Sequence, residues 1–227
     1  MKLFIIILSL LICYTAFFML GFRAWKKGAN NLIHKQGELA SLLLLNAKHC
    51  ASMLILAIPF LLFYNSNSFF IAWPSNISYS GIILLMAFIF LLAIIACKSS
   101  KSASVQLTAF SIPAISTSIS SIVAFFLIRI CFLVVYECYF RGIVLATTLQ
   151  IAPVGWAIII NLVLYVAVHV FSNKIEILAC IPFGLLACCF TINWQSVVPA
   201  ILLHTIFAIV YEGCLLQKAI IFSPKIL

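Results

Sequence analysis

Charge is the feature that this sequence has least of. Only 7% of its 227 residues are charged, Asp is absent, and the acidic residues are Glu38, Glu137, Glu176 and Glu212. A soluble domain of ordinary composition carries about 25% charged residues. So few charges cannot cover a surface that faces water. The composition therefore excludes a soluble globular protein and predicts that lipid surrounds most of the chain.

Interruptions of the apolar sequence are also scarce. Hydrophobic residues make up 66% of the chain, in long continuous runs without a two-residue alternation. A membrane span needs about 20 mostly apolar residues, and its backbone must be hydrogen-bonded internally. We therefore predict an all-α, polytopic helical bundle of about seven spans, within a range of six to eight. The predicted spans cover residues 3–21, 50–64 (or from about 39), 81–97, 121–149, 155–171, 177–192 and 197–214.

Two further features are missing from the sequence. It has no CxxC pair, and its nine cysteines lie mainly inside the apolar runs, which indicates small buried hydrophobes and no disulfide framework. No convincing cleavage site follows the first apolar run, from Leu3 to Phe22, which is also too long for a usual signal sequence. We expect this run to be a retained first span.

Basic residues are the charge that is present. Lys and Arg number 13 and the formal charge is +9, but they are scattered and no soluble basic domain holds them. We therefore expect contact with anionic lipid and no nucleic-acid partner. The loop after the first span is the most basic, with Arg23, Lys26, Lys27, His34 and Lys35. Basic loops face the cytoplasm, which predicts that the N-terminus lies outside.

The sequence divides into three parts. We predict N-terminal transmembrane helices over 1–120, a helical core over 121–215 and a short tail over 216–227. The stretch from Ser99 to Ser121 is rich in Ser and Thr and contains Pro113. It fits an interfacial helix, a re-entrant piece or half of a long span. If it crosses the membrane alone, there are eight spans and the later helices invert.

Ionisable side chains within spans are the best candidates for function, because they are energetically expensive there. Glu137 and Arg141 share one predicted helix at the favourable i, i+4 spacing, and His169 and His204 lie on two others. Converging, they would form a membrane-embedded polar site. The alternative is structural: the ion pair neutralises itself and each histidine is a packed or hydrogen-bonded contact.

Two histidines and a carboxylate can bind a divalent metal such as zinc or activate a water molecule. His169 ends a face that also carries Tyr165, one turn earlier, and Asn161, two turns earlier. The spacing of the histidines is not that of an HExxH helix. The sequence alone leaves the choice between metal and water open.

Four short motifs then occur in order. ECYFRG spans 137–142, YxxxH spans 165–169, PFG spans 182–184 and PAILLH spans 199–204. Their order and their placement on apolar helices resemble the CPBP family of intramembrane endopeptidases, the CAAX-processing and bacteriocin-processing group. The resemblance covers roughly residues 128–211.

The resemblance implies a membrane protease that cleaves hydrophobic, lipidated or small peptide substrates. Glu137, His169 and His204 would be catalytic, activating water or holding a metal ion. Arg141, Tyr136 and Tyr165 would support them, with Tyr136 as a hydroxyl donor. For a bacterial chain the resemblance implies the inner (cytoplasmic) membrane.

The chain departs from the family pattern at two positions. Tyr136 stands where the family has the first glutamate of EExxxR, and Ala208 stands where HxxxN or HxxxD ends. Glu212 and Asn161 are conceivable substitutes, but each lies about 10–12 Å along its helix from its histidine. We therefore keep a second hypothesis, a degenerate family member that binds a peptide or confers bacteriocin immunity. A small transporter or channel subunit is a third, although no repeat symmetry supports it.

Overall fold

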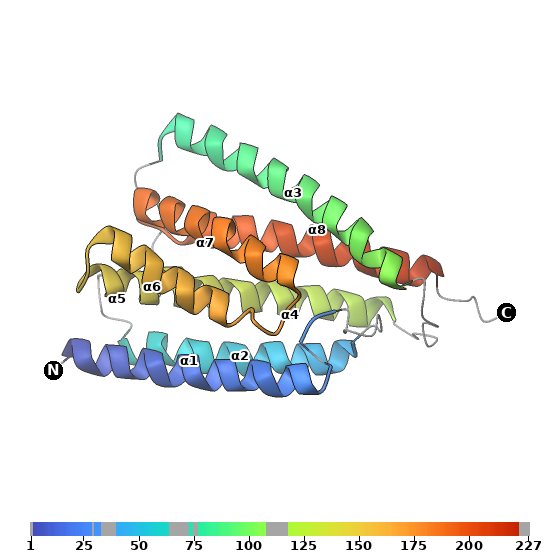
Figure 1. The fold of residues 1–227 in the computed structure, drawn as a ribbon, viewed down its shortest axis with the longest axis horizontal. Coiled ribbons are helices and arrows are strands. Elements are labelled where there is room, and N and C mark those ends of the chain that lie inside the picture. The colour runs from blue at the N-terminus through green and yellow to red at the C-terminus, as the bar shows by residue number, and fades with distance from the viewer. Residues whose placement is uncertain are drawn as a thin grey trace.

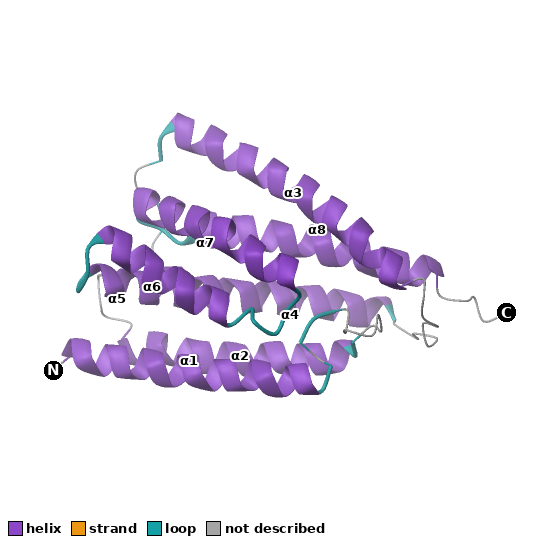
Figure 2. Ribbon diagram, in the orientation of Figure 1, coloured by secondary structure: helices purple, strands orange, loops and turns teal. Residues whose placement is uncertain are grey.

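The structure is a computed structural model that describes residues 2–28, 30–32, 40–63, 73–74, 77–107 and 118–222. Helices and their connecting turns account for these residues, with no strand among them (Figure 2). The predicted basic-loop residues His34 and Lys35 lie outside the described residues, as does Glu38.

The helices follow the predicted apolar runs closely. They are α1 (Lys2–Lys26), α2 (Leu42–Phe63), α3 (Tyr79–Leu107), α4 (Ile119–Glu137), the π-helical segment η1 (Cys138–Val144), α5 (Leu145–Leu149), α6 (Val154–Ala167), α7 (Lys174–Trp194) and α8 (Val198–Phe222). Segments α4, η1 and α5 form one continuous rod. Among the described residues six helical stretches are long and apolar enough to cross a membrane, and α6 is a shorter apolar helix. The prediction of a polytopic helical membrane protein is confirmed.

Successive helices run in opposite directions through the bundle (Figure 1). Helices α1 and α2 form one side, the α4 rod and α6 lie in the middle, and α3 packs along α8 on the far side. Helix α3 ends and α4 begins at the same end of the bundle. The described helices therefore favour seven passes over eight.

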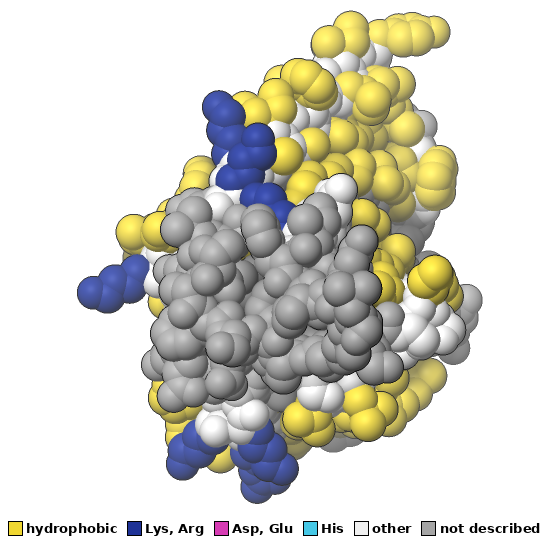
Figure 3. All heavy atoms as spheres, turned by 90° about the vertical axis from the view of Figure 1, so that its right-hand side faces the viewer, with side chains coloured by type: hydrophobic (Ala, Val, Ile, Leu, Met, Phe, Trp, Pro, Cys, Tyr) yellow, Lys and Arg dark blue, Asp and Glu magenta, His cyan; other side chains and the backbone are white. Residues whose placement is uncertain are grey.

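Basic side chains gather at the end of the bundle where α1 and α3 finish. Figure 3 looks at this end and shows Lys and Arg around its rim. Arg23 and Lys26 lie in the last turn of α1, and Lys98 and Lys101 lie near the end of α3. We call this the basic end.

Helix α6 is shorter than its neighbours. It has 14 residues against 25 for α8, which corresponds to about 21 Å against about 37 Å. The turn between α6 and α7 therefore lies short of the ends of α4 and α8 (Figure 1). Asn173 caps α7 by accepting a hydrogen bond from Glu176 N at 2.8 Å. This recessed hairpin leaves room inside the bundle on the side of the basic end.

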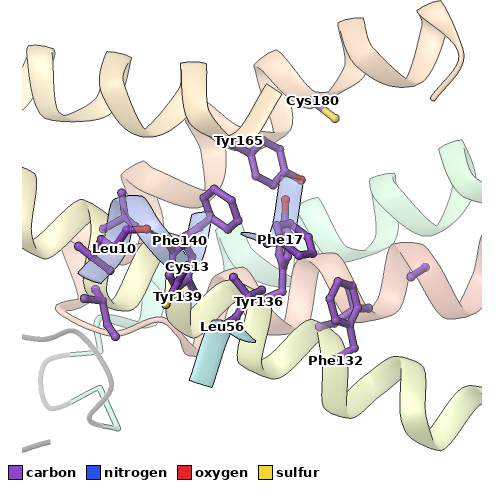
Figure 4. Packing of buried hydrophobic residues seen from close by; sticks show 14 of the residues in the cluster. Leu10, Cys13, Phe17, Leu56, Phe132, Tyr136, Tyr139, Phe140, Tyr165 and Cys180 are labelled. Atoms are coloured by element: carbon purple, nitrogen blue, oxygen red, sulfur yellow. Dashed lines mark hydrogen bonds between the residues drawn. The ribbon is translucent and has the colours of Figure 1, made fainter. Parts of the chain in front are cut away.

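Aromatic packing joins α1 to the α4 rod. Phe17, Phe132, Tyr136 and Phe140 belong to one buried cluster, drawn in Figure 4. Within it Tyr139 donates a hydrogen bond to the carbonyl of Leu10 at 2.7 Å. The predicted first span is thus an integral wall of the core.

Candidate functional site

Two of the predicted site residues touch directly. His204 Nδ1 on α8 lies 2.5 Å from Glu137 Oε1 on α4, and they form a hydrogen bond. Glu137 is completely buried, whereas the His204 side chain keeps 13% of its surface exposed. The contact joins residues 67 positions apart in the chain. Helix packing therefore builds the centre of the site.

Arg141 occupies the other side of the same carboxylate. Its Nη1 lies 3.2 Å from Glu137 Oε2, and both side chains are fully buried. Its guanidinium also stacks over the ring of Tyr165, 3.9 Å from the ring centroid. The two oxygens of Glu137 thus face two different partners. The carboxylate therefore lies between a histidine and a stacked arginine.

A π-helical turn follows Glu137 directly. The wider turn of η1 changes the backbone hydrogen bonding next to the site, and such turns are frequent at functional sites. Asn161 Nδ2 donates to the carbonyl of Phe140 within this turn at 2.6 Å. Cys188 Sγ lies 3.3 Å from Asn161 Oδ1. Asn161 therefore braces the turn from α6.

His169 lies just beyond the end of α6. We expected a helix to residue 171, but it ends at Ala167 and His169 lies in the following turn. Its Nδ1 lies 2.8 Å from the carbonyl of Tyr165. In a regular helix the backbone N–H of residue 169 would donate a hydrogen bond to this carbonyl. Here the imidazole of His169 donates in its place and caps the helix. This hydrogen bond fixes the His169 ring at the turn between α6 and α7.

The partners of the two histidines determine their tautomers. A carboxylate and a carbonyl can only accept hydrogen bonds, so the neutral rings carry their proton on Nδ1 in both His169 and His204. In each neutral ring Nε2 is then an acceptor. An imidazole nitrogen of this kind can take a proton from water. Both rings are therefore prepared to act as bases.

Both histidines line a cavity of about 750 Å³ inside the bundle. It extends from them to the basic end, where Asn31, Ser172 and Glu176 are on its wall. Its other walls are largely apolar, formed by residues of α3, α7 and α8: Phe88, Leu92, Phe183, Leu186 and Phe207. The cavity thus connects polar side chains near the basic end with the two imidazoles.

Tyr136 completes the site from α4. Its ring lies edge-on to the ring of His204 at 5.7 Å between centroids and to that of His169 at 6.4 Å. Figure 4 shows Tyr136 and Tyr165 pointing toward each other from α4 and α6. The Tyr136 hydroxyl is buried and has no hydrogen-bond partner among the described residues. Tyr136 thus places a ring with an unpartnered hydroxyl next to the two imidazole rings.

The two conceivable substitutes are engaged elsewhere. Glu212 pairs with Arg129, with Oε1 2.9 Å from Nη2. Asn161 is bound to the η1 turn. Ala208 lies one turn after His204 on the cavity wall and supplies no polar group. Glu212 and Asn161 therefore do not supply the side-chain groups that are missing at Tyr136 and Ala208.

Among the described residues no three His, Cys, Asp or Glu side chains form a group that would hold a metal ion. Both oxygens of Glu137 already face His204 and Arg141. The arrangement of Glu137, His169 and His204 does not fit a three-ligand metal site. A zinc cofactor stays a prediction.

Sequence reasoning passed over one further cluster. Arg129 on α4 pairs with Glu212 on α8, and its Nη1 lies 3.2 Å from His49 Nε2 on α2. The spacing of these residues along the sequence indicates the Arg129–Glu212 pair. Arg129 precedes Glu137 by eight residues, and Glu212 follows His204 by eight, as two contacts between antiparallel helices require.

The comparisons with known proteins agree with the motif order. Residues 117–210 match the family model described as type II CAAX prenyl endopeptidase Rce1-like. Searches of the curated proteins and of the solved structures gave no match. The matched segment, under half of the chain, contains Glu137, His169 and His204. The family-model match to an Rce1-like type II CAAX prenyl endopeptidase domain at residues 117–210 is consistent with the CPBP family of intramembrane endopeptidases.

Proposed function

We propose that this protein is an intramembrane endopeptidase in which His204 activates the attacking water. The observation that carries the proposal is the Glu137–His204 contact, with Arg141 behind Glu137 and the cavity in front of His204. A buried carboxylate at Nδ1 fixes the imidazole tautomer and stabilises the imidazolium that forms. Glu137 therefore acts as the orienting partner of His204, and the base is the imidazole.

The proposed reaction can be written with the site residues and water. His204 Nε2 takes a proton from water as the water oxygen bonds to the peptide carbonyl carbon. The Tyr136 hydroxyl donates a hydrogen bond to the oxygen that becomes negative. The C–N bond then breaks as His204 returns its proton to the leaving amine. His169 lies beside the same space as a second base for the water or the amine.

The cavity suits a hydrophobic, lipidated or small peptide substrate. Its apolar walls would accept side chains or a lipid tail, and the polar side chains on its wall near the basic end would bind the peptide backbone. We place the basic end on the cytoplasmic side, because Lys and Arg mark cytoplasmic loops. For a bacterial chain this is the inner membrane.

A peptide-binding or immunity protein without catalysis is the second candidate. Tyr136 and Ala208 favour it, since one replaces a family carboxylate and the other a family amide. Losing a positioned base reduces a rate by about 10²–10⁴-fold. The retained carboxylate–imidazole pair beside a cavity favours the enzyme.

Cleavage of hydrophobic and lipidated peptides by the protein in nanodiscs tests the proposal. Wild type, His204→Ala and Tyr136→Glu are compared, each with and without a chelator. Cleavage by wild type that His204→Ala abolishes supports the enzyme, and the chelator lanes decide the metal question. An inert wild type with an active Tyr136→Glu variant supports the degenerate relative. If all are inert on peptides that a control family protease cleaves, the binding function replaces the proposal.

A further inference from the structure

A second polar contact joins the helices that carry Glu137 and His204. Arg129 Nη2 on α4 lies 2.9 Å from Glu212 Oε1 on α8, and Arg129 Nε lies 3.3 Å from Oε2. The side chains keep only 20% and 11% of their surface exposed. An arginine that meets both carboxylate oxygens is directional as well as charged.

We call each of the two contacts, Glu137–His204 and Arg129–Glu212, a rung between the antiparallel helices α4 and α8. Each lies eight residues from the other on both α4 and α8, which is about 12 Å along the helix axes. Because the two rungs have the same spacing on both helices, together they define the register of α8 on α4. Sliding α8 by one turn would move it about 5.4 Å and break both rungs together. The apolar contacts between the helices, such as Phe125 with Leu215, are less directional.

A third helix supports the outer rung. Arg129 can only donate, so His49 Nε2 accepts the hydrogen bond from Nη1 at 3.2 Å. The His49 ring stacks on Phe132 of α4, with 4.8 Å between centroids. Helix α2 thereby holds the guanidinium in place from the side opposite α8. Arg129 is thus fixed by residues of α2, α4 and α8.

We propose that the Arg129–Glu212 pair, supported by His49, is a positioning element that sets the register of α8 on α4 and so holds His204 against Glu137. Its effect on catalysis rests on the function proposed above, but its effect on the Glu137–His204 contact does not. The pair does not offer an anion site, because Glu212 already neutralises Arg129.

The test reads the His204 contact directly, without activity. Protein labelled with nitrogen-15 histidine is studied by NMR in nanodiscs, with the His204 signals assigned by their loss in His204→Ala. Glu137→Gln gives the signals of His204 without its carboxylate. We expect Glu212→Gln to move the His204 signals toward those of Glu137→Gln, and the swap Arg129→Glu with Glu212→Arg to restore them. Glu176 is a half-buried carboxylate on the wall of the same cavity and accepts a hydrogen bond from Ser172, so Glu176→Gln should leave the His204 signals unchanged.

Unchanged His204 signals in a folded Glu212→Gln variant would overturn the proposal. Should that variant fail to fold, the charge swap decides: wild-type signals support the positioning role, and shifted signals in a folded swap refute it. If the wild type cleaves peptide, kcat should fall about 10²-fold in Glu212→Gln with KM little changed. A wild type that cleaves nothing would refute the enzyme and leave the NMR result valid.

Discussion

Tyr136 combines a ring that packs in the buried aromatic cluster with a hydroxyl that makes no stabilising hydrogen bond among the described residues. The ring lies edge-on to the rings of His169 and His204, and the hydroxyl itself is buried. An unpaired buried hydroxyl is unfavourable, and removing it is close to neutral. Retaining it makes sense if its partner is the oxygen of a bound peptide.

We therefore expect Tyr136→Phe to separate activity from stability. Cleavage should fall by about 10²–10³-fold, as for the loss of an oxyanion donor, while the free energy of unfolding should change by less than about 1 kcal/mol. Tyr14→Phe is the matched control, because its hydroxyl donates to the carbonyl of Leu164 at 3.1 Å. It should lose about 1 kcal/mol of stability and keep its activity. Full activity in Tyr136→Phe would remove the donor from the mechanism.

Arg141 is the residue on which the buried carboxylate depends most. Removing one partner of a buried ion pair leaves an uncompensated charge, at a cost of about 3–5 kcal/mol. We expect Arg141→Met to lose stability of this order, because Glu137 is fully buried. The double variant Arg141→Met with Glu137→Gln should recover a large part of the loss. Unfolding in detergent measures both, and equal losses in the single and double variants would show that the pairing is unimportant.

At the scale of elements, close packing between α6 and α7 sets the position of Tyr165. A methyl group on Gly184 of α7 would lie 2.7 Å from Leu162 Cδ1 and 3.2 Å from Tyr165 Cδ1. It would also approach Arg141 Nη2 to 3.4 Å. Glycine at this position allows the ring of Tyr165 to lie beneath the guanidinium.

Gly184→Ala should therefore displace Tyr165 and destabilise the protein by about 1–3 kcal/mol, as overpacking does. Gly155→Ala on α6 is the control, since a methyl group there meets nothing within 4 Å. That substitution should be neutral or gain up to about 1 kcal/mol from helix propensity. Thermal unfolding of both variants gives the comparison. A neutral Gly184→Ala would mean that Leu162 and Tyr165 move aside freely.

The sequence predicts elements better than it predicts their contacts. Long apolar runs set the helices, and the i, i+4 face of Asn161 and Tyr165 is buried as its spacing indicates. The early end of α6 depends on the imidazole cap of His169, which hydropathy does not register. The η1 turn depends on Asn161 from another helix. Such features arise from tertiary contacts, so local patterns cannot specify them.

The contacts within the site can be recognised only from the packing of the helices. Motif order brings Glu137, His169 and His204 to attention, but it does not say that Glu137 meets His204 through Nδ1. In the mechanism proposed above, that contact makes Glu137 the orienting group of His204, with the imidazole as the base. The Arg129–Glu212 pair has no motif at all, and only the equal eight-residue spacing on two antiparallel helices indicates it.

At the scale of the whole molecule, the membrane topology determines on which side of the membrane the basic end lies. Lys27 follows α1 and Lys174 begins α7 at this end, whereas Gln195 follows α7 at the opposite end. With seven passes, Lys27→Cys and Lys174→Cys should be protected from a membrane-impermeant maleimide in intact cells, and Gln195→Cys should react. Native cysteines are first blocked or replaced, and permeabilised cells show that each site can be labelled. With eight passes the second half would invert, so that Lys174→Cys would react and Gln195→Cys would not. That outcome would move the opening of the cavity, and any substrate it admits, to the outer face.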